Sequence, residues 1–387
     1  MFEGFESGRI AVDDVEIAYV AAGAGEPLLM LHGFPQTKAL WARIAPELVA
    51  LGYRVICADL RGYGASHKPP ARADLTNYSF RAMAADQLGL MKTLGHERFH
   101  LVGHDRGARV AHRLALDHSA AVASVTLMDI VPTAVMLGDL RREVAQSYWH
   151  WFFLAQPAPF PERMIEANPD LFYETCLFGW GAAGLLDFDA GQLAAYRASW
   201  HDAKAIAGGC NDYRAALAVD LAHDLAEQGR RISAPALILY GASGAMAKLY
   251  DLPATWADRC TTMDACAVPG GHFFPDSAPV EVTEQLAAFL GRHPLPLCRS
   301  KVRTIAPARR HAVKLWTAAS SSSPSACVIT PQWNGRSARR TGEPGGRGLP
   351  CCRMQNRRQA TLCRQPRSGR YRRRPRSPCA RRRIGEK

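Results

Sequence analysis

The stretch HLVGHDRGARVAH, at residues 100–112, decides the fold class, because it combines the end of a strand, a tight turn and the start of a helix. An apolar run leads into Gly103, and helical spacing follows to about His118. Two glycines, Gly103 and Gly107, flank Asp105 in a strand–turn–helix pattern that typically holds a nucleophile at the edge of a sheet. The alternative is a simple turn in which Asp105 caps the helix, since Asp caps helices well.

A regular alternation of strand and helix surrounds this turn. The opening GRIAVDDVEIAYVAAGAGEP (8–27) predicts two short strands around an Asp-Asp turn, and helical spacing recurs at 38–51, at 80–94 and near 280–290. The other strand signals are apolar, β-rich runs, namely PLLMLHG, YRVICADL, VASVTLMDI, APALILYG and DACAVPGGH. Such alternation predicts an α/β fold whose mostly parallel central sheet is covered by helices on both faces.

The stretch 131–226 interrupts this alternation. It is rich in aromatic residues at helical spacing, as in SYWHWFFLAQ and DLFYETCLFGWG, and contains no convincing strand. We expect a helical cap, inserted after the sixth strand, over the carboxyl edge of the sheet, where open α/β sheets bind ligands. The core then consists of residues 1–130 and 227–292.

The segment 293–387 differs from the rest in charge. The whole chain carries +13, but this segment holds 24 of the 48 Lys and Arg and 2 of the 35 Asp and Glu, so it carries +22 and the preceding residues carry −9. Stretches such as SSSSPSA and RYRRRPRSPCARRR predict disorder. One interpretation is a nucleic-acid-binding tail. The Arg bias, isolated Trp residues and unpatterned cysteines favour the other, an extension without selected structure, so we do not expect nucleic acid as a partner.

Composition also limits the kind of protein. The five cysteines before residue 293 are scattered without metal-ligand spacing, and we interpret them as reduced, mostly buried thiols. The first residues lack a signal-peptide pattern, and no apolar run approaches the roughly 20 residues that span a bilayer. We expect a cytoplasmic protein that does not bind membranes and uses neither a metal nor a cofactor.

The residue type at the turn indicates the chemistry. A serine suits attack on an acyl carbon, but attack on a saturated carbon would leave it as a stable ether. A carboxylate is already anionic at pH 7, and the ester that it forms can be hydrolysed by water. Asp105 therefore predicts displacement of a leaving group at a saturated carbon, followed by ester hydrolysis.

Ester hydrolysis needs a general base and a group that orients it. His272 follows the last strand signal and Asp129 ends an earlier one, which gives the nucleophile–acid–base order of enzymes with this turn. Asp105, Asp129 and His272 are thus the predicted catalytic residues. The alternatives are a structural loop histidine and a strand-end Asp, and Asp251 is a rival orienter.

Positive charge accompanies the predicted nucleophile. Arg106 and Arg109 lie three residues apart and share one helix face. Such arginines are usually solvated, but one of these belongs to the turn itself. Two anions about 4 Å apart repel by roughly 4 kcal/mol at an effective dielectric near 20, and two guanidiniums can cancel that repulsion and bind a carboxylate. We therefore expect a small anionic acid as substrate, and backbone N–H groups of Phe34 and Arg106 to hold the ester oxyanion.

The chain resembles the α/β-hydrolase-fold haloacetate (fluoroacetate) dehalogenases over roughly residues 5–291. The resemblance rests on the motifs LHGFPQT, DLRGYGAS, GHDRGARVAHRLALDH, MDIVPT, YWHWFFLAQP, FGWG, DYRAA and GGHFFP. The Arg directly after the nucleophile is the distinguishing feature, since the related haloalkane dehalogenases and epoxide hydrolases usually have Trp there. The resemblance implies an α/β-hydrolase fold, hydrolysis of fluoroacetate to glycolate, and a homodimer.

The resemblance also implies the roles given above to the catalytic residues and the two arginines, and adds residues of the cap. His150, Trp151 and Tyr213 would donate hydrogen bonds to the departing halide, and Trp180 would line the pocket. An aromatic stripe at helical spacing is more often core than site. However, imidazole N–H, indole N–H and phenol O–H are all donors, which fluoride needs in order to leave.

Two other functions stay open. An epoxide hydrolase also uses an Asp at this turn but needs two tyrosines in the cap. Tyr213 is one candidate, and Tyr148, Tyr173 and Tyr196 have no clear claim to be the second. The body could also be a non-catalytic binder of small acids that carries a nucleic-acid-binding tail.

Overall fold

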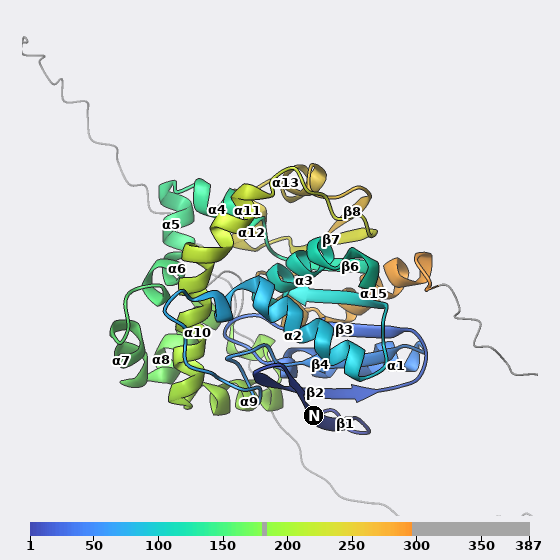
Figure 1. Cartoon of the computed structure of the whole chain (residues 1–387), viewed down its shortest axis with the longest axis horizontal. Helices are drawn as coiled ribbons and strands as arrows, with labels where there is room; N and C mark the ends of the chain where they lie inside the picture. The colour runs from blue at the N-terminus through green and yellow to red at the C-terminus, as the bar shows by residue number, and fades with distance from the viewer. Residues whose placement is uncertain (180–183, 296–387) are drawn as a thin grey trace, which may run out of the picture. The chain divides into compact units, whose positions relative to one another are not determined.

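The computed structural model of the protein describes residues 1–179 and 184–295, which contain an eight-stranded sheet (Figure 1). Its order is β1-β2-β4-β3-β5-β6-β7-β8. The strands are β1 (Glu6–Val12), β2 (Val15–Ala22), β3 (Pro27–Leu31), β4 (Arg54–Ala58), β5 (Phe99–His104), β6 (Val122–Met128), β7 (Ala236–Gly241) and β8 (Met263–Val268). Strands β3 to β8 are mutually parallel, and β1 and β2 form an antiparallel hairpin at one edge. The predicted mostly parallel sheet is confirmed.

Helices connect most of these strands. The α-helices are α1 (Ala45–Ala50), α2 (Phe80–Thr93), α3 (Arg106–Asp117), α4 (Thr133–Gly138), α5 (Arg142–Ser147), α6 (Trp149–Leu154), α7 (Phe160–Glu166), α8 (Pro169–Gly179), α9 (Ala190–Trp200), α10 (Ala203–Ala215), α11 (Leu221–Ala226), α12 (Ala245–Leu249), α13 (Leu252–Ala257), α14 (Phe274–Ser277) and α15 (Pro279–Arg292). The short 3-10 helices are η1 (Lys38–Arg43), η2 (Thr76–Tyr78), η3 (Ser119–Ala121) and η4 (Leu185–Asp187), and η5 (Ala216–Asp220) is a π-helical turn.

Two hydrophobic clusters cover the two faces of the sheet. Successive residues of β3 alternate between them: Leu29 and Leu31 belong to the cluster that includes α2 and α3, whereas Leu28 and Met30 belong to the cluster that includes α1 and α15. Alternation along a strand sends neighbouring side chains to opposite faces. Both faces of β3 are therefore buried, as expected for a parallel strand in the middle of an α/β sheet.

The helix expected at 38–51 is interrupted. The structure has η1 up to Arg43 and a separate helix α1 from Ala45, with Pro46 in its first turn. Proline lacks the N–H that a continuous helix needs and is tolerated in a first turn. The expectation of one helix was wrong because apolar spacing alone does not register this break.

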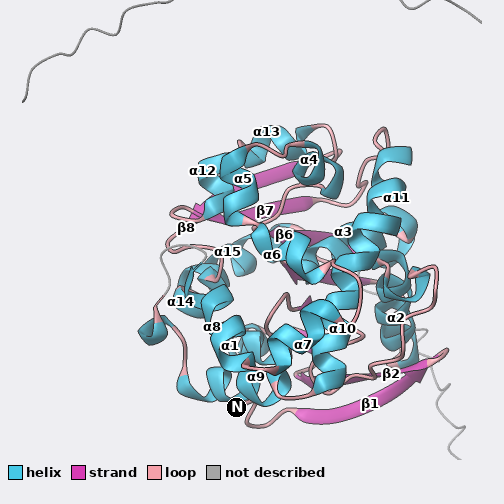
Figure 2. Cartoon of the chain, turned by 90° about the vertical axis from the view of Figure 1, so that its left-hand side faces the viewer, coloured by secondary structure: helices cyan, strands magenta, loops and turns pink. Residues whose placement is uncertain are grey.

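The stretch between β6 and β7 folds into the helices α4 to α11, and its described residues contain no strand. Figure 1 shows α6, α7 and α10 together beyond one end of the strands, and in Figure 2, which looks from that side, they lie in front of the sheet. Side chains from α9 attach the cap to the core: Gln192 donates to the backbone oxygens of Ala39 and Leu40 at 2.9 and 3.0 Å, and the Trp200 indole donates to that of Pro35 at 2.7 Å. The cap therefore has a fixed position over the loop that follows β3.

Three sequence expectations can be compared with the described residues. The five cysteines are free thiols, four of them buried. None of the described helices combines the length and apolarity that crossing a bilayer requires. No group of three or more His, Cys, Asp or Glu side chains within residues 1–179 and 184–295 could hold a metal ion. The predicted tail lies outside the described residues from residue 296 onward.

Candidate active site

The turn between β5 and α3 holds Asp105 in an unusual conformation. Its φ of 48° and ψ of −114° lie in a region that residues other than glycine rarely adopt. Close packing leaves no room for relaxation: a Cβ on Gly107 would lie 2.4 Å from the backbone oxygen of His32, and a Cβ on Gly103 would lie 2.4 Å from that of Gly107. Strained turns of this kind are typical of functional sites.

The Asp105 side chain does not cap the helix that follows it. It makes no capping hydrogen bond with α3, and its Oδ2 instead accepts from the backbone N–H of Phe34 at 3.0 Å. Burial would raise the pKa of Asp105, but nearby positive charge, first that of His272 and then that of Arg106 and Arg109, lowers the pKa below its usual value. The capping interpretation is therefore wrong, and the carboxylate is anionic at neutral pH.

Asp129 follows β6 directly and lies fully buried beside His272. Its Oδ2 accepts a hydrogen bond from His272 Nδ1 at 2.6 Å, and its Oδ1 accepts from the Gly241 N–H at 3.1 Å. Burial would lower the pKa of His272, but the hydrogen bond and charge of Asp129 and the charge of Asp105 raise it above 6.5. The rival Asp251 caps α13 instead. His272 Nε2 faces Asp105 Oδ1 at 4.0 Å, so the three predicted catalytic side chains form one cluster.

Arg106 is fully buried against Asp212, a carboxylate that the sequence prediction did not include. Its Nε donates to Asp212 Oδ2 at 2.8 Å, and its Nη2 donates to Oδ1 and to the backbone oxygen. Burial would lower the pKa of Arg106, but the Asp212 charge raises it above its usual value. Only Nη1 has no hydrogen-bond partner among the described residues. The one signal for Asp212 in the sequence is its place directly before Tyr213 in DYRAA.

Arg109 is also buried, but its partners are neutral. Its Nη1 donates to the backbone oxygen of Val131 and to Thr133 Oγ1, both at 3.1 Å, and its Nη2 contacts Met136 Sδ at 3.5 Å. In the described part of the chain Arg109 forms no salt bridge, and its Nε is buried without a partner. Burial and the charge of Arg106 lower the pKa of Arg109 to about 10, so it is cationic at neutral pH. Both arginines are thus buried at the turn rather than solvated.

The three predicted halide donors come together within the cap. The Tyr213 ring on α10 lies 5.7 Å from that of His150 and 5.3 Å from that of Trp151, both on α6, and 5.2 Å from that of Phe34. Burial lowers the pKa of His150 well below 6.5 and raises the pKa of Tyr213 well above 10, so the imidazole is neutral and the phenol is protonated. The buried Tyr213 hydroxyl has no partner within the described residues. Trp180 lies outside them.

Tyr148 is a neighbour of this cluster that the sequence did not single out. It is buried, and its ring lies 5.9 Å from that of His150. Burial, followed by the negative charges of Asp129 and Asp105, raises the pKa of Tyr148 well above 10. Its hydroxyl is therefore protonated within electrostatic reach of the nucleophile. The sequence offered Tyr148 only as one of three cap tyrosines without a clear role, two residues before a predicted halide donor.

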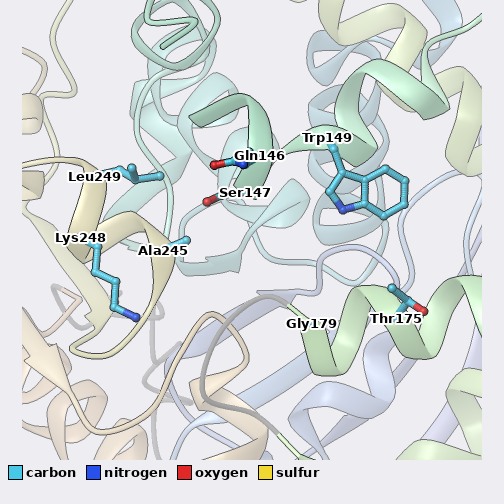
Figure 3. A pocket seen from close by; sticks show the side chains of 8 residues that line it. All are labelled: Gln146, Ser147, Trp149, Thr175, Gly179, Ala245, Lys248 and Leu249. Carbon is cyan, nitrogen blue, oxygen red and sulfur yellow. The ribbon is translucent and has the colours of Figure 1, made fainter. Parts of the chain in front are cut away.

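A hollow of about 440 Å³ lies outside the cluster, between α5 and α6, α8 and α12 (Figure 3). Its lining residues are Gln146, Ser147, Trp149, Thr175, Gly179, Ala245, Lys248 and Leu249. None of them is a predicted site residue, but Trp149 directly precedes His150 in α6. Among the described lining residues, Lys248 is the one that carries a charge.

Comparison with known proteins identifies relatives of the whole body of the chain. Residues 26–279 match a family model described as alpha/beta hydrolase fold. The chain is 53% identical over 290 residues to a fluoroacetate dehalogenase from Burkholderia sp, covering 75% of this chain and 95% of that one. It is 29% identical over 287 residues to a soluble epoxide hydrolase from Corynebacterium sp. (strain C12), and the match covers 72% of this chain and 94% of that one. A solved structure assigned to the α/β hydrolases, from Nostoc sp PCC 7120, is 44% identical with a TM-score of 0.73, and the match covers 75% of this chain and 99% of that one.

Proposed function

This chain belongs to the α/β-hydrolase family, and from that premise we propose that it is a haloacetate dehalogenase that hydrolyses fluoroacetate to glycolate and halide. The observation that carries the proposal is an anionic nucleophile beside a buried cation that forms no salt bridge among the described residues. Asp105 is anionic, and Arg109, on which the charge of Asp105 acts, donates hydrogen bonds to neutral groups. A substrate carboxylate would form an ion pair with Arg109. The carbon next to that carboxylate, which bears the leaving group, would then face Asp105.

The first step displaces the halide. Asp105 Oδ1 attacks the carbon that bears the halogen, a C–O bond forms as the C–halogen bond breaks, and the carbon inverts. The Phe34 N–H, 3.0 Å from Oδ2, stabilises that oxygen, which becomes the carbonyl oxygen of the ester. Arg109 offsets the repulsion between the two carboxylates, which at about 4 Å amounts to roughly 4 kcal/mol. A further N–H for the oxyanion, that of Arg106, stays a prediction.

The departing halide needs hydrogen-bond donors in a site that excludes water. We assign this role to His150, Trp151 and Tyr213. Neutral His150 and protonated Tyr213 each keep a donor at neutral pH, and the Tyr213 hydroxyl is buried without a partner among the described residues. Trp180, proposed as a lining residue, cannot be placed within the described residues.

The second step hydrolyses the ester. His272 Nε2 takes a proton from a water molecule that attacks the carboxyl carbon of Asp105. The bond between that carbon and the glycolate oxygen then breaks, and the imidazolium returns the proton to the departing oxygen, so that glycolate leaves and Asp105 is restored. Asp129, 2.6 Å from His272 Nδ1, orients the imidazole and stabilises its positive charge. The 4.0 Å between His272 Nε2 and Asp105 Oδ1 is a suitable distance for a base that acts through water.

Single-turnover hydrolysis in heavy-oxygen water tests this covalent route. The label is expected in the Asp105 carboxylate after one turnover and in glycolate only after later ones. Label that appears only in the product throughout would exclude the ester. Fluoride release from fluoroacetate, compared with chloride release from chloroacetate, determines which halides the enzyme expels.

Epoxide hydrolysis is a second candidate, and one specific observation favours it. Two protonated tyrosines, Tyr148 and Tyr213, lie within reach of the charge of Asp105, and an epoxide hydrolase needs two such donors. Against this, a neutral epoxide would leave Arg109 uncompensated. Turnover of a neutral epoxide that is unaffected by Arg109→Ala would support this candidate over the first.

A homodimer and a cytoplasmic location remain our proposals. A second copy of the chain would cover apolar side chains that the cap exposes on α7 and α8, namely Phe160, Met164 and Leu171. The solution mass of the protein tests the dimer.

A further inference from the structure

The two arginines beside the proposed nucleophile differ in their partners, which their spacing in the sequence does not indicate. Arg106 forms a buried ion pair with Asp212, whereas Arg109 has only neutral hydrogen-bond partners in the described part of the chain. Both lie against the Trp151 ring, at 4.9 and 4.8 Å from its centroid. They therefore share a wall of the site but do not contribute equally to its net charge.

Asp212 and two aromatic rings hold the Arg106 guanidinium in place. Two guanidinium nitrogens donate to its carboxylate, and the Tyr63 hydroxyl donates to the same Oδ2 at 2.7 Å. The guanidinium carbon lies 4.2 Å from the Tyr213 ring centroid and 4.6 Å from that of Phe80. The guanidinium is thus bound along one edge and packed against rings, so only Nη1 is left to bind a substrate. Nη1 is buried and has no hydrogen-bond partner among the described residues.

We propose that Asp212 is a positioning and specificity-determining residue that neutralises Arg106 and aims its Nη1 into the site, so that Arg109 alone supplies the charge that selects an anionic substrate. This inference rests on the proposed function and deepens it. Arg106 then acts as a directed hydrogen-bond donor to any small substrate with an acceptor oxygen. Arg109 distinguishes a carboxylate from a neutral group of the same shape, because of the two arginines only Arg109 forms no ion pair among the described residues.

The test compares chloroacetate with chloroacetamide, a neutral analogue of similar size. The measured quantity is the ratio of kcat/KM for the acid to kcat/KM for the amide, and the variants are Arg109→Gln, Arg106→Gln, Asp212→Asn and Asp212→Glu. Asp86→Asn is the matched control. Asp86 is a buried carboxylate that binds Arg61 through two hydrogen bonds, at 2.8 and 2.7 Å, and no described hydrogen bond or ion pair joins it to the site.

The variants have different expected effects on that ratio. Arg109→Gln lowers the ratio by on the order of 100-fold, since a charged hydrogen-bonded partner of the carboxylate is lost. Arg106→Gln slows both substrates and changes the ratio less than about tenfold. Asp212→Asn raises the ratio, because Arg106 then carries an uncompensated charge, and lowers kcat for both substrates because the guanidinium loses its fixed direction. Asp212→Glu returns the ratio toward that of the unmodified protein, because the negative charge is restored.

Two results would overturn the proposal. One is a ratio in Asp212→Asn that is unchanged, as in Asp86→Asn, which would make Asp212 a structural residue. The other is an equal loss of the ratio in Arg106→Gln and Arg109→Gln, which would mean that the two arginines share the charge. If the unmodified chain releases no halide from either compound, the proposed function is wrong, but the role of Asp212 is not yet decided by that result. The affinities of acetate and acetamide for the same variants, measured by calorimetry, then test the role of Asp212 without turnover.

Discussion

The Nε2 atom of His272 lies 4.0 Å from Oδ1 of Asp105, beyond hydrogen-bond distance but close enough for the two charges to interact. The charge of Asp105 is one of the causes that raise the pKa of His272. Formation of an ester on Asp105 removes that charge. The nucleophile thus controls the basicity of the residue that later hydrolyses its ester, which links the two steps of the proposed reaction.

This link predicts a specific pH dependence. His272 accepts a proton only when neutral, so ester hydrolysis slows as the pH falls through the pKa of His272 in the ester. That pKa is expected to be lower than the pKa of His272 in the free protein, which lies above 6.5. The measurements are the NMR titration of the His272 ring in the free protein and the pH profile of single-turnover ester hydrolysis.

Asp105→Asn provides the control for that experiment, because it removes the charge and keeps the shape of the side chain. The NMR midpoint of His272 should fall in this variant. An acid limb of hydrolysis at or above the midpoint for the free protein would contradict the proposed link.

Replacement of Asp105 by alanine is expected to reduce halide release by on the order of 10⁴-fold or more, since no other anion can form the ester. Halide release and the circular dichroism spectrum are measured together, so that loss of activity is separated from loss of fold. Asp251→Ala is the control, because Asp251 is an exposed cap of α13. Activity of Asp105→Ala within tenfold of the unmodified protein would refute the assignment.

His272→Gln should separate the two steps. Asp105 can still displace halide, but water lacks its base, so at most one equivalent of halide per protein is released in a burst. Mass spectrometry of a proteolytic digest should then find a carboxymethyl group on the peptide that contains Asp105. Continued turnover at more than about one hundredth of the normal rate would argue against His272 as the base.

Tyr213→Phe should impair defluorination more than dechlorination. Fluoride accepts stronger hydrogen bonds than chloride, and loss of one buried donor costs about 1–3 kcal/mol, which is roughly a 5- to 150-fold loss of rate. Rates of fluoride and chloride release are compared for this variant and for Tyr196→Phe. Tyr196 is also a buried cap tyrosine, but its hydroxyl donates to Asp276 at 2.9 Å, so its loss should affect both substrates equally. An equal loss in Tyr213→Phe would assign it a structural role.

The turn that presents Asp105 should tolerate no side chain at Gly107. A Cβ there would lie 2.4 Å from the backbone oxygen of His32, so Gly107→Ala is expected to lower the free energy of unfolding by about 3 kcal/mol. Gly138→Ala is the matched control, since nothing lies within 4 Å of a Cβ at that position. Chemical denaturation measures both, and similar stabilities would show that the turn can relax.

The cluster of Asp105, Asp129 and His272, to which we assign catalysis, could be predicted from the sequence because of topology. Asp105, Asp129 and His272 each follow a strand signal, and parallel strands bring their carboxyl ends to one edge of the sheet. The prediction failed in detail where a local break overrode apolar spacing, as at Pro46 between η1 and α1. It did not single out Tyr148, because an aromatic residue at helical spacing gives the same signal in a core and in a site.

The sequence by itself determined that the turn carries an aspartate, our proposed nucleophile, with two cations beside it, since both are properties of nearby residues in one turn. Which of the two cations is paired with a buried carboxylate was decided only by the tertiary structure. Asp212 lies 106 residues after Arg106 and meets it only because α10 of the cap folds over α3. Compensation of a charge depends on distance in space and on burial, and neither quantity can be read from the spacing of residues along the chain.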